Sequence, residues 1–237
     1  RDVLLDLPEK SRFVVPLEIT KPKEYHKAEN DFIGWLTKKS QSKAKKAKKA
    51  LAIVRMGYLK RLAARLKWKG VLDWVDNFLE ASEGKLILFA VHKKPIKLLR
   101  ERYRRRCVVI DGSTSQPKRM LAVDQFQKNK RIRILIGNIR AAGKGLNLTA
   151  ASAVAFAEMG WTPGEHNQAE DRAHRIGQTR GLNCYYLVAN GTIESDLCEL
   201  IQQKASVFDS VFDGEKEVDT LDIFDQLQIE IKKRSRK

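Results

Sequence analysis

Short apolar segments alternate with helix-like segments throughout residues 84–212, and this alternation constrains the fold more than any other feature of the chain. Apolar runs typical of buried strands lie at 85–90, 107–110, 131–136, 153–157 and 183–188. Strands that alternate with helices form a parallel sheet with right-handed crossovers and helices on both faces. We therefore predict an α/β fold whose ligands bind at the carboxyl ends of the strands, in the loops at 91–93, 111–115, 137–149 and 158–166.

The N-terminal third of the chain has a different composition. Residues 13–19 resemble a strand, and Pro16 within them favours an edge position. Residues 21–82 have a helical pattern, and 38–69 hold thirteen lysines and arginines without one acidic residue. An apolar stripe predicts that one side of a helix docks, leaving a basic surface opposite; its residues are Leu51, Val54, Tyr58 and Leu62, with Leu59 and Leu66 beside them. That basic surface is either a nucleic-acid contact or a solvated, lysine-rich face.

These changes in pattern divide the chain into four predicted segments. They are a linker with an edge strand at 1–20, a basic helical subdomain at 21–82, the α/β lobe at 83–212 and a flexible tail at 213–237. Because the first residue is Arg1 and not methionine, we expect the chain to be part of a longer protein.

The bulk composition indicates the kind of partner and the compartment. A net charge of +17 favours a polyanionic partner, most commonly nucleic acid, without separating DNA from RNA. No apolar run approaches the length of a membrane span, so no membrane partner is expected. Cys107, Cys184 and Cys198 are widely spaced and odd in number, which predicts buried thiols in a reducing, intracellular compartment (cytoplasm, nucleoid or nucleus).

Residues 167–178 (NQAEDRAHRIGQ) carry a candidate anion site. If this segment is helical, Gln168, Arg172 and Arg175 share one face, while Ala169, Ala173 and Ile176 form an apolar column against the sheet. Two guanidinium groups one turn apart suit a triphosphate, because each pairs bidentately with phosphate oxygens. The alternative is a solvated helix with ordinary ion pairs such as Asp171–Arg175.

The glycine-rich loop at 137–145 looks like a phosphate-binding loop but fails the spacing test. Five residues separate Gly137 from Gly143 where the motif has four, and Gly145 occupies the position of the Mg²⁺-binding hydroxyl. No pair of acidic residues follows any predicted strand, so we expect no metal site in this chain. Gly143 and Gly145 permit a positive φ, either for a close backbone approach or for an ordinary tight turn.

The loop after the second predicted strand has two interpretations. Ser113 and Thr114, with Lys118 and Arg119 at the start of the next helix, are suited to seating a phosphate on backbone N–H groups. An ordinary helix cap at Ser115 explains the same residues.

Taken in order, these segments resemble the second RecA-like lobe of superfamily-two helicases, specifically the Swi/Snf-type DNA translocases. The matching segments are 85–90, 110–114, Arg119, 126–127, 142–151, 161–163, 168–178 and 191–194. Residues 156–158 and 161–164 are most similar to the annealing-helicase branch. The helical region 21–82 resembles that family's helical protrusion in position only.

The resemblance implies a RecA-like fold and a composite ATPase that uses ATP with Mg²⁺. The phosphate loop and the Mg²⁺ ligands would lie on an N-terminal RecA-like lobe of the same parent protein, and the DNA partner would be double-stranded or branched, as in repair. Carried over by motif, Arg172 and Arg175 would be arginine fingers. Gln168, Gly143, Gly145 and Asn147 would line the ATP cleft, and Ser113, Thr114, Arg119 and Thr149 would contact DNA. Lys144 departs from the family pattern.

Two alternatives to a motor lobe remain at this point. A non-catalytic nucleic-acid-binding or regulatory module would retain the fold but have no use for the face formed by Gln168, Arg172 and Arg175. An RNA helicase lobe fits less well with Trp161 and with the Ile-Gly-Gln ending at 176–178.

Overall fold

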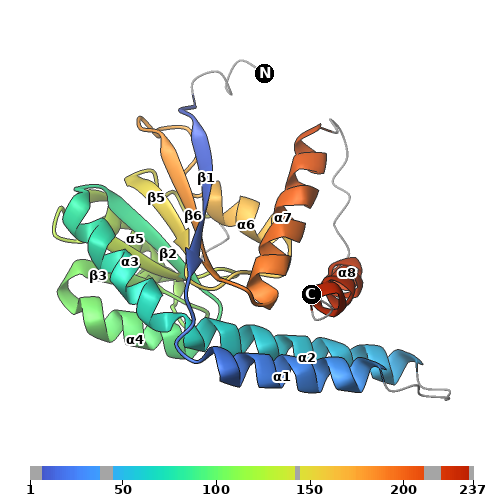
Figure 1. Ribbon diagram of the computed structural model, residues 1–237. Coiled ribbons are helices and arrows are strands. Elements are labelled where there is room, and N and C mark those ends of the chain that lie inside the picture. Colours follow the sequence, from blue (N-terminus) through green and yellow to red (C-terminus); the bar gives the residue numbers. More distant parts are fainter. Residues whose placement is uncertain (1–6, 38–44, 142–144, 211–219, 235–237) are drawn as a thin grey trace. The chain divides into compact units, whose positions relative to one another are not determined.

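The computed structural model describes residues 7–37, 45–141, 145–210 and 220–234. The strands are β1 Lys10–Leu17, β2 Lys85–Ala90, β3 Cys107–Ile110, β4 Ile134–Asn138, β5 Ala151–Phe156 and β6 Leu182–Ala189. The helices are α1 Pro22–Thr37, α2 Lys45–Leu66, α3 Trp68–Ala81, α4 Lys93–Tyr103, α5 Gln116–Lys128, α6 Pro163–Glu170, α7 Ile193–Ser210 and α8 Thr220–Arg234. Figure 1 shows their arrangement.

The strands form one six-stranded sheet in the order β1-β6-β5-β2-β4-β3. The pairings of β2 with β4 and β5, of β3 with β4 and of β5 with β6 are parallel. β1 also runs parallel to β6, since the N–H of Leu182 donates to Glu9 O and the N–H of Asn190 donates to Leu17 O. The predicted parallel α/β sheet and the edge position of the N-terminal strand are confirmed.

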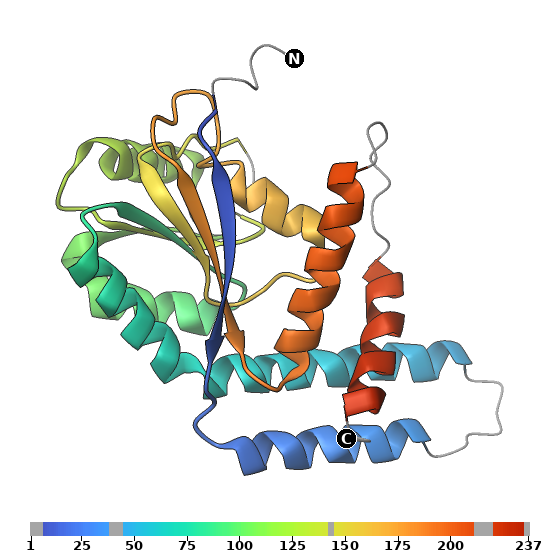
Figure 2. The ribbon, with the colours of Figure 1, turned by 45° about the horizontal axis from the view of Figure 1, so that its top comes forward.

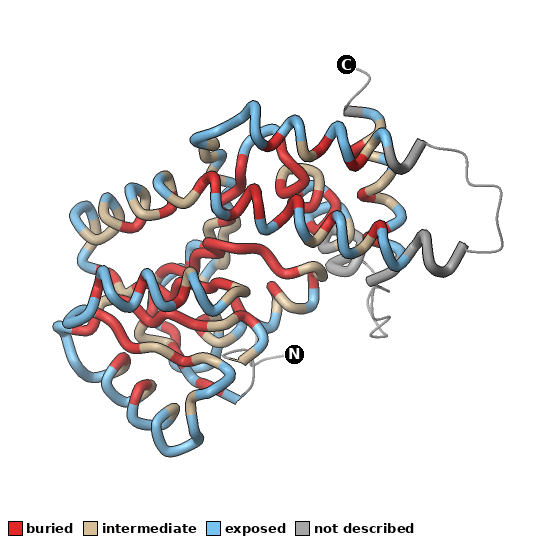
Figure 3. The backbone as a smooth tube through the Cα atoms, turned by 90° about the horizontal axis from the view of Figure 1, so that it is seen from below, coloured by how far each residue is buried: buried red, intermediate tan, exposed pale blue. Residues whose placement is uncertain are grey.

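Helical crossovers join the parallel strands of the sheet. The chain moves outward from β2 through α4 to β3 and returns through α5 to β4. Right-handed crossovers therefore place α4 and α5 on opposite faces of the sheet, as Figure 2 illustrates. The central strands are covered on both faces, and the tube in Figure 3 is red along them. Leu86 to Ala90 are wholly buried, as their unbroken apolar run predicts.

The chain divides into two compact units. The first contains residues 1–15 and 73–187, and the second contains 16–72 and 188–237. The first holds most of the sheet with α4, α5 and α6, and it carries all the candidate site residues named above. The second consists mainly of α1, α2, α7 and α8, with α2 against α1 and α7, and α8 against α7.

The buried face of α2 differs from the predicted docking stripe. Leu51, Val54 and Tyr58 are exposed, whereas Leu59, Leu62 and Leu66 are buried as expected. Small or flexible side chains, Ala52, Met56 and Ala63, complete the buried face instead. The prediction placed the bulkiest apolar residues inward, but close packing against α1 and α7 selects residues by shape as well as by hydrophobicity.

The expected flexible tail at 213–237 is also corrected within its described part. Residues 220–234 form α8, whose buried side chains Ile223, Phe224, Leu227 and Ile231 recur at helical spacing. Lys204 of α7 pairs with Asp222 of α8. The charged residues of this segment, including the basic run at its end, made it look solvent-exposed throughout, so the apolar stripe was not recognised from the sequence.

Candidate functional site

Two loops at the carboxyl edge of the sheet are joined by a buried carboxylate. Glu158, after β5, accepts hydrogen bonds from the backbone N–H groups of Val91 and His92 at 2.7 and 2.8 Å, and its other oxygen lies 2.8 Å from His92 Nδ1. Burial acts to raise the pKa of Glu158, but the hydrogen bonds from His92 and Val91 outweigh burial and lower it. Asn138, at the end of β4, donates to Val91 O at 2.7 Å. These contacts fix the loops that follow β2, β4 and β5 relative to one another.

The loop after β3 folds around one aspartate. Asp111 Oδ1 accepts hydrogen bonds from Ser113 N, Ser113 Oγ and Thr114 Oγ1, at 2.7–3.0 Å. The bonds from Ser113 and Thr114 lower the pKa of Asp111 against the opposing effect of burial. Both hydroxyl donors assigned to DNA contact are therefore engaged within the loop, and their contact with DNA stays a proposal. Ser115 is the N-cap residue of α5, but its side chain makes no capping hydrogen bond.

Arg119 links this loop to the glycine-rich loop. Its guanidinium donates to three backbone carbonyls, Thr114 O at 2.9 Å, Asp111 O at 3.3 Å and Ala141 O at 3.1 Å. Three fixed donors on one planar group hold two loops in a defined relation. The structure thus gives Arg119 a positioning role, and its contact with DNA remains a prediction.

Residues 142–144 of the glycine-rich loop, which include Gly143 and Lys144, lie outside the described residues. Gly145 has φ +69°, the conformation that the sequence analysis allowed for. Asn147 is exposed. Gln127 of α5 holds the end of the loop, since its amide nitrogen donates to Thr149 Oγ1 at 3.3 Å and its oxygen accepts from Ala150 N at 2.8 Å.

The arginine-bearing segment is not one continuous helix, and this prediction is wrong. α6 begins at Pro163, with Thr162 capping Glu165 N, and ends at Glu170 with Asp171 as its C-cap. Residues 171–177 are turns, and Gly177 has φ +97°. Gln168 is therefore exposed on α6, whereas the half-buried Arg172 and the exposed Arg175 project from turns.

The apolar column predicted for this segment is correct in part. Ala169 and Ala173 are completely buried, but Ile176 is 68% exposed. The alternative, a solvated helix, paired Asp171 with Arg175; in the structure, Asp171 Oδ1 contacts Lys10 Nζ at 3.3 Å. The register of a regular helix does not continue beyond Glu170, so spacing could not place these side chains.

Backbone bonds join the glycine-rich loop to the arginine segment. Leu148 N donates to Arg172 O at 2.8 Å. Gln178 Nε2 donates to Ala151 O at 2.8 Å and to Ala173 O at 3.1 Å. The glycine-rich loop is thus tied to Arg172 at residue 148 and to Arg119 at residue 141, so the candidate nucleotide and DNA residues form one connected edge.

Sequence comparison identifies the lobe. Residues 70–177 match the family described as the helicase conserved C-terminal domain. Over 223 residues, 91% of this chain, the sequence is 38% identical to the mouse DNA annealing helicase and endonuclease ZRANB3. The chain is a C-terminal helicase lobe of the Swi/Snf class. The helicase lobe spans 20% of the length of that mouse relative.

A second relative agrees with this assignment, and two solved structures share the fold. The helicase lobe is 40% identical, over 147 residues, to the Xenopus tropicalis SWI/SNF-related matrix-associated actin-dependent regulator of chromatin subfamily A-like protein 1, which covers 61% of this chain and 16% of that protein. The fold matches the Sulfolobus solfataricus SWI2/SNF2 ATPase core in complex with dsDNA, with a TM-score of 0.72 at 21% identity over 98% of this chain and 51% of that one. It matches the C-terminal part of the Fun30 ATPase domain with a TM-score of 0.68 at 18% identity, covering 94% and 99% of the two chains.

Three residues near the arginine segment, Lys10, Arg12 and Glu170, were not predicted from the sequence as site residues. Glu170 is fully buried beside the arginine segment and binds Arg12 of β1. The available signal was the pair Lys10 and Arg12, two basic side chains at a spacing of two residues on an edge strand, which places both on the same face. Their partners are about 160 residues away along the chain, so only the folded structure connects them.

Proposed function

We propose that this helicase lobe is one half of a composite ATPase in an ATP-dependent translocase of double-stranded or branched DNA. The ATP would be brought by a phosphate-binding, N-terminal RecA-like lobe of the same protein. Arg172 and Arg175 would act as arginine fingers on the transferring phosphoryl group. Gln168, Gly143, Gly145 and Asn147 would line this lobe's side of the ATP cleft.

The observation that carries the proposal is the hydrogen bond from Leu148 N to Arg172 O, at 2.8 Å. It fixes the arginine segment to the loop that carries Gly145 and Asn147. Guanidinium groups keep their charge at any working pH and pair with phosphate oxygens, so this edge suits a nucleotide polyphosphate. A non-catalytic module would have no need for this arrangement.

We place the Mg²⁺ ligands on the other lobe. Within the described residues, no group of three or more His, Cys, Asp or Glu side chains is arranged to hold a metal ion. Asp111, the acidic residue directly after β3, already accepts hydrogen bonds from Ser113 and Thr114. The chemistry of these side chains fits the phosphate end of ATP and not its metal.

We further propose that the DNA backbone contacts Ser113 and Thr114 in the loop after β3, Arg119 at the start of α5, and Thr149 in the loop that precedes β5. Phosphate contacts carry little sequence information, so translocation would be largely independent of sequence. The protein would act inside the cell, where its cysteines stay reduced; Cys107, Cys184 and Cys198 are buried free thiols. None of the described helices has the length and apolarity needed to cross a membrane.

Salt-dependent DNA binding tests this contact. Lys118, exposed in the first turn of α5, is expected to meet a phosphate together with the loop at 111–115. Lys118→Ala should lower the affinity of the full-length protein for duplex DNA and reduce the slope of log K against log salt by about 1. Lys128→Ala, in the last turn of the same helix, is the matched control and should leave the slope unchanged.

Equal slopes for the two variants would contradict the proposed DNA contact. Competition at one stated salt concentration completes the test, with duplex DNA expected to displace the bound probe more effectively than RNA of the same length. Preferential displacement by RNA would instead favour an RNA helicase lobe.

A further inference from the structure

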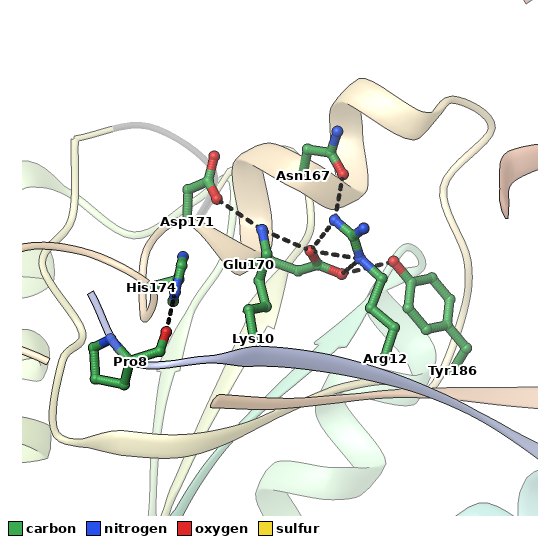
Figure 4. Close-up of polar contacts among 8 residues, drawn as sticks. All are labelled: Pro8, Lys10, Arg12, Asn167, Glu170, Asp171, His174 and Tyr186. Atoms are coloured by element: carbon green, nitrogen blue, oxygen red, sulfur yellow. Dashed lines mark hydrogen bonds and ion pairs between the residues drawn. The ribbon is translucent and has the colours of Figure 1, made fainter. Parts of the chain in front are cut away.

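The edge strand β1 contacts the segment that carries the arginine pair. Lys10 and Arg12 lie on the same face of β1 and point toward the end of α6 (Figure 4). Arg12 Nη2 lies 2.7 Å from Glu170 Oε2, and Arg12 Nε lies 3.1 Å from both oxygens of that carboxylate. Arg12 Nη2 also donates to Asn167 Oδ1 at 3.0 Å. One guanidinium therefore fixes the last turn of α6.

Glu170 is a fully buried carboxylate whose charge is compensated from β1. Besides Arg12, it accepts a hydrogen bond from Tyr186 Oη at 2.7 Å and lies 3.3 Å from Lys10 Nζ. Burial acts to raise its pKa, but Arg12, Lys10 and Tyr186 together lower the pKa of Glu170 below its ordinary value. Glu170 is fully buried, so losing the bidentate bond from the partly buried Arg12 would leave its charge poorly compensated.

Two further contacts extend the same connection past the end of the helix. Lys10 Nζ lies 3.3 Å from Asp171 Oδ1, and His174 Nε2 lies 2.7 Å from Pro8 O. Asp171 and His174 each directly precede one arginine of the pair. Residues of β1 and its approach thus hold the chain immediately before Arg172 and immediately before Arg175.

The arginine segment needs such support because α6 ends at Glu170. In a continuous helix, the backbone hydrogen bonds would set the direction of each side chain, but residues 171–177 are turns. β1 also lies outside residues 70–177, which match the helicase domain family. The support therefore comes from a segment that precedes the recognised domain in the chain.

We infer that Lys10 and Arg12 of β1, acting through Glu170, Asp171 and the backbone at Pro8, are positioning residues that set where Arg172 and Arg175 project. This inference rests on the proposed function, because it concerns the geometry of the arginine fingers. A displacement of about 1 Å in a catalytic group can cost on the order of 100-fold in rate. Loss of the β1 contacts should thus reduce catalysis without removing any group that touches ATP.

The test compares Arg12→Ala and Arg12→Lys in the full-length protein, using steady-state ATP turnover with saturating DNA. Arg12→Ala should lower kcat by about 10- to 100-fold and leave the KM for ATP within about twofold, as expected for an interaction that matters in the transition state. Arg12→Lys keeps the charge without the bidentate geometry and should recover part of the loss. Glu170→Gln, which keeps the side-chain shape, should lower kcat in the same manner. It provides the same test if Arg12→Ala does not fold.

A matched control separates positioning from stability. Arg102→Ala removes another arginine–carboxylate pair, with Asp76, in the same compact unit but away from residues 167–178. Because that pair is partly exposed, its loss should lower the Tm only slightly and leave kcat within about twofold. If Arg102→Ala and Arg12→Ala reduce kcat equally, or if Arg12→Lys and Glu170→Gln retain the full kcat, the inference is wrong.

A double-mutant cycle separates this inference from the proposed function. Combining Arg12→Lys with Arg175→Ala should lower kcat by less than the product of the two single losses, because one of the two positioned groups is absent. Fully additive losses would overturn the positioning role while leaving the arginine fingers in place. If Arg172→Ala and Arg175→Ala themselves leave turnover unchanged, the proposed function fails and the inference fails with it.

Discussion

Replacing Arg172 or Arg175 by alanine in the full-length protein is expected to lower ATP turnover by about 10³-fold or more. An arginine finger stabilises the charge that develops on the transferring phosphoryl group, and this effect is worth about 10³–10⁵ in kcat where it has been measured. Binding of duplex DNA should stay nearly unchanged, because the proposed phosphate contacts are made by other residues, Ser113, Thr114, Arg119 and Thr149. The measurements are DNA-stimulated ATP turnover and DNA affinity on the same protein preparations.

Arg131→Ala provides the control for these two variants. Arg131 is exposed and precedes β4, so it lies at the amino end of the strands, opposite the candidate site. Its loss should leave both turnover and DNA affinity unchanged. Unchanged turnover in Arg172→Ala and Arg175→Ala would refute the role assigned to the pair.

Breaking the ion pair between Lys67 and Glu194 should have the largest effect on stability. Both side chains are completely buried, with Lys67 Nζ 2.6 Å from Glu194 Oε2. The same carboxylate oxygen accepts a hydrogen bond from Ala189 N at 2.9 Å. Removing one partner leaves the other charge buried and uncompensated, so Lys67→Met should lower the free energy of unfolding by about 3–5 kcal/mol.

The double variant Lys67→Met with Glu194→Gln should recover part of this loss, because it removes the uncompensated charge. Lys69→Met, at an exposed position in the first turn of α3, is the control and should change stability little. Urea unfolding of the chain and its variants gives the free energies. A Lys67→Met variant as stable as the control would show that this pair does not hold the second compact unit together.

The alternation of apolar strands and helices was enough to predict the sheet. β2 and β3 begin and end where the pattern predicts, because unbroken apolar runs and the adjacent turns mark their ends. The third predicted run, at 131–136, instead forms β4 at 134–138, since Asn129 Oδ1 accepts a hydrogen bond from Arg131 N and keeps the residues before β4 in a turn. Local patterns predict elements well and their boundaries less well.

The arrangement of the candidate site could not be predicted from the sequence, for a different reason. Spacing placed Arg172 and Arg175 on one helix, but the helix ends at Glu170, and Ile176 faces solvent. The contacts that decide this geometry join Arg12 to Glu170 and Leu148 to Arg172, across long separations in the sequence. Helical periodicity carries no information about such contacts, so the motif identified the residues without their arrangement.

ATP hydrolysis by this chain alone tests the central claim most directly, because the claim is that the lobe supplies only part of an active site. The isolated 237-residue chain, with Mg²⁺ and duplex DNA, should bind ATP weakly and show no turnover above background. The same chain joined to its phosphate-binding lobe should hydrolyse ATP under identical conditions, in a manner that depends on Arg172. Robust, metal-dependent hydrolysis by the isolated chain would contradict the account.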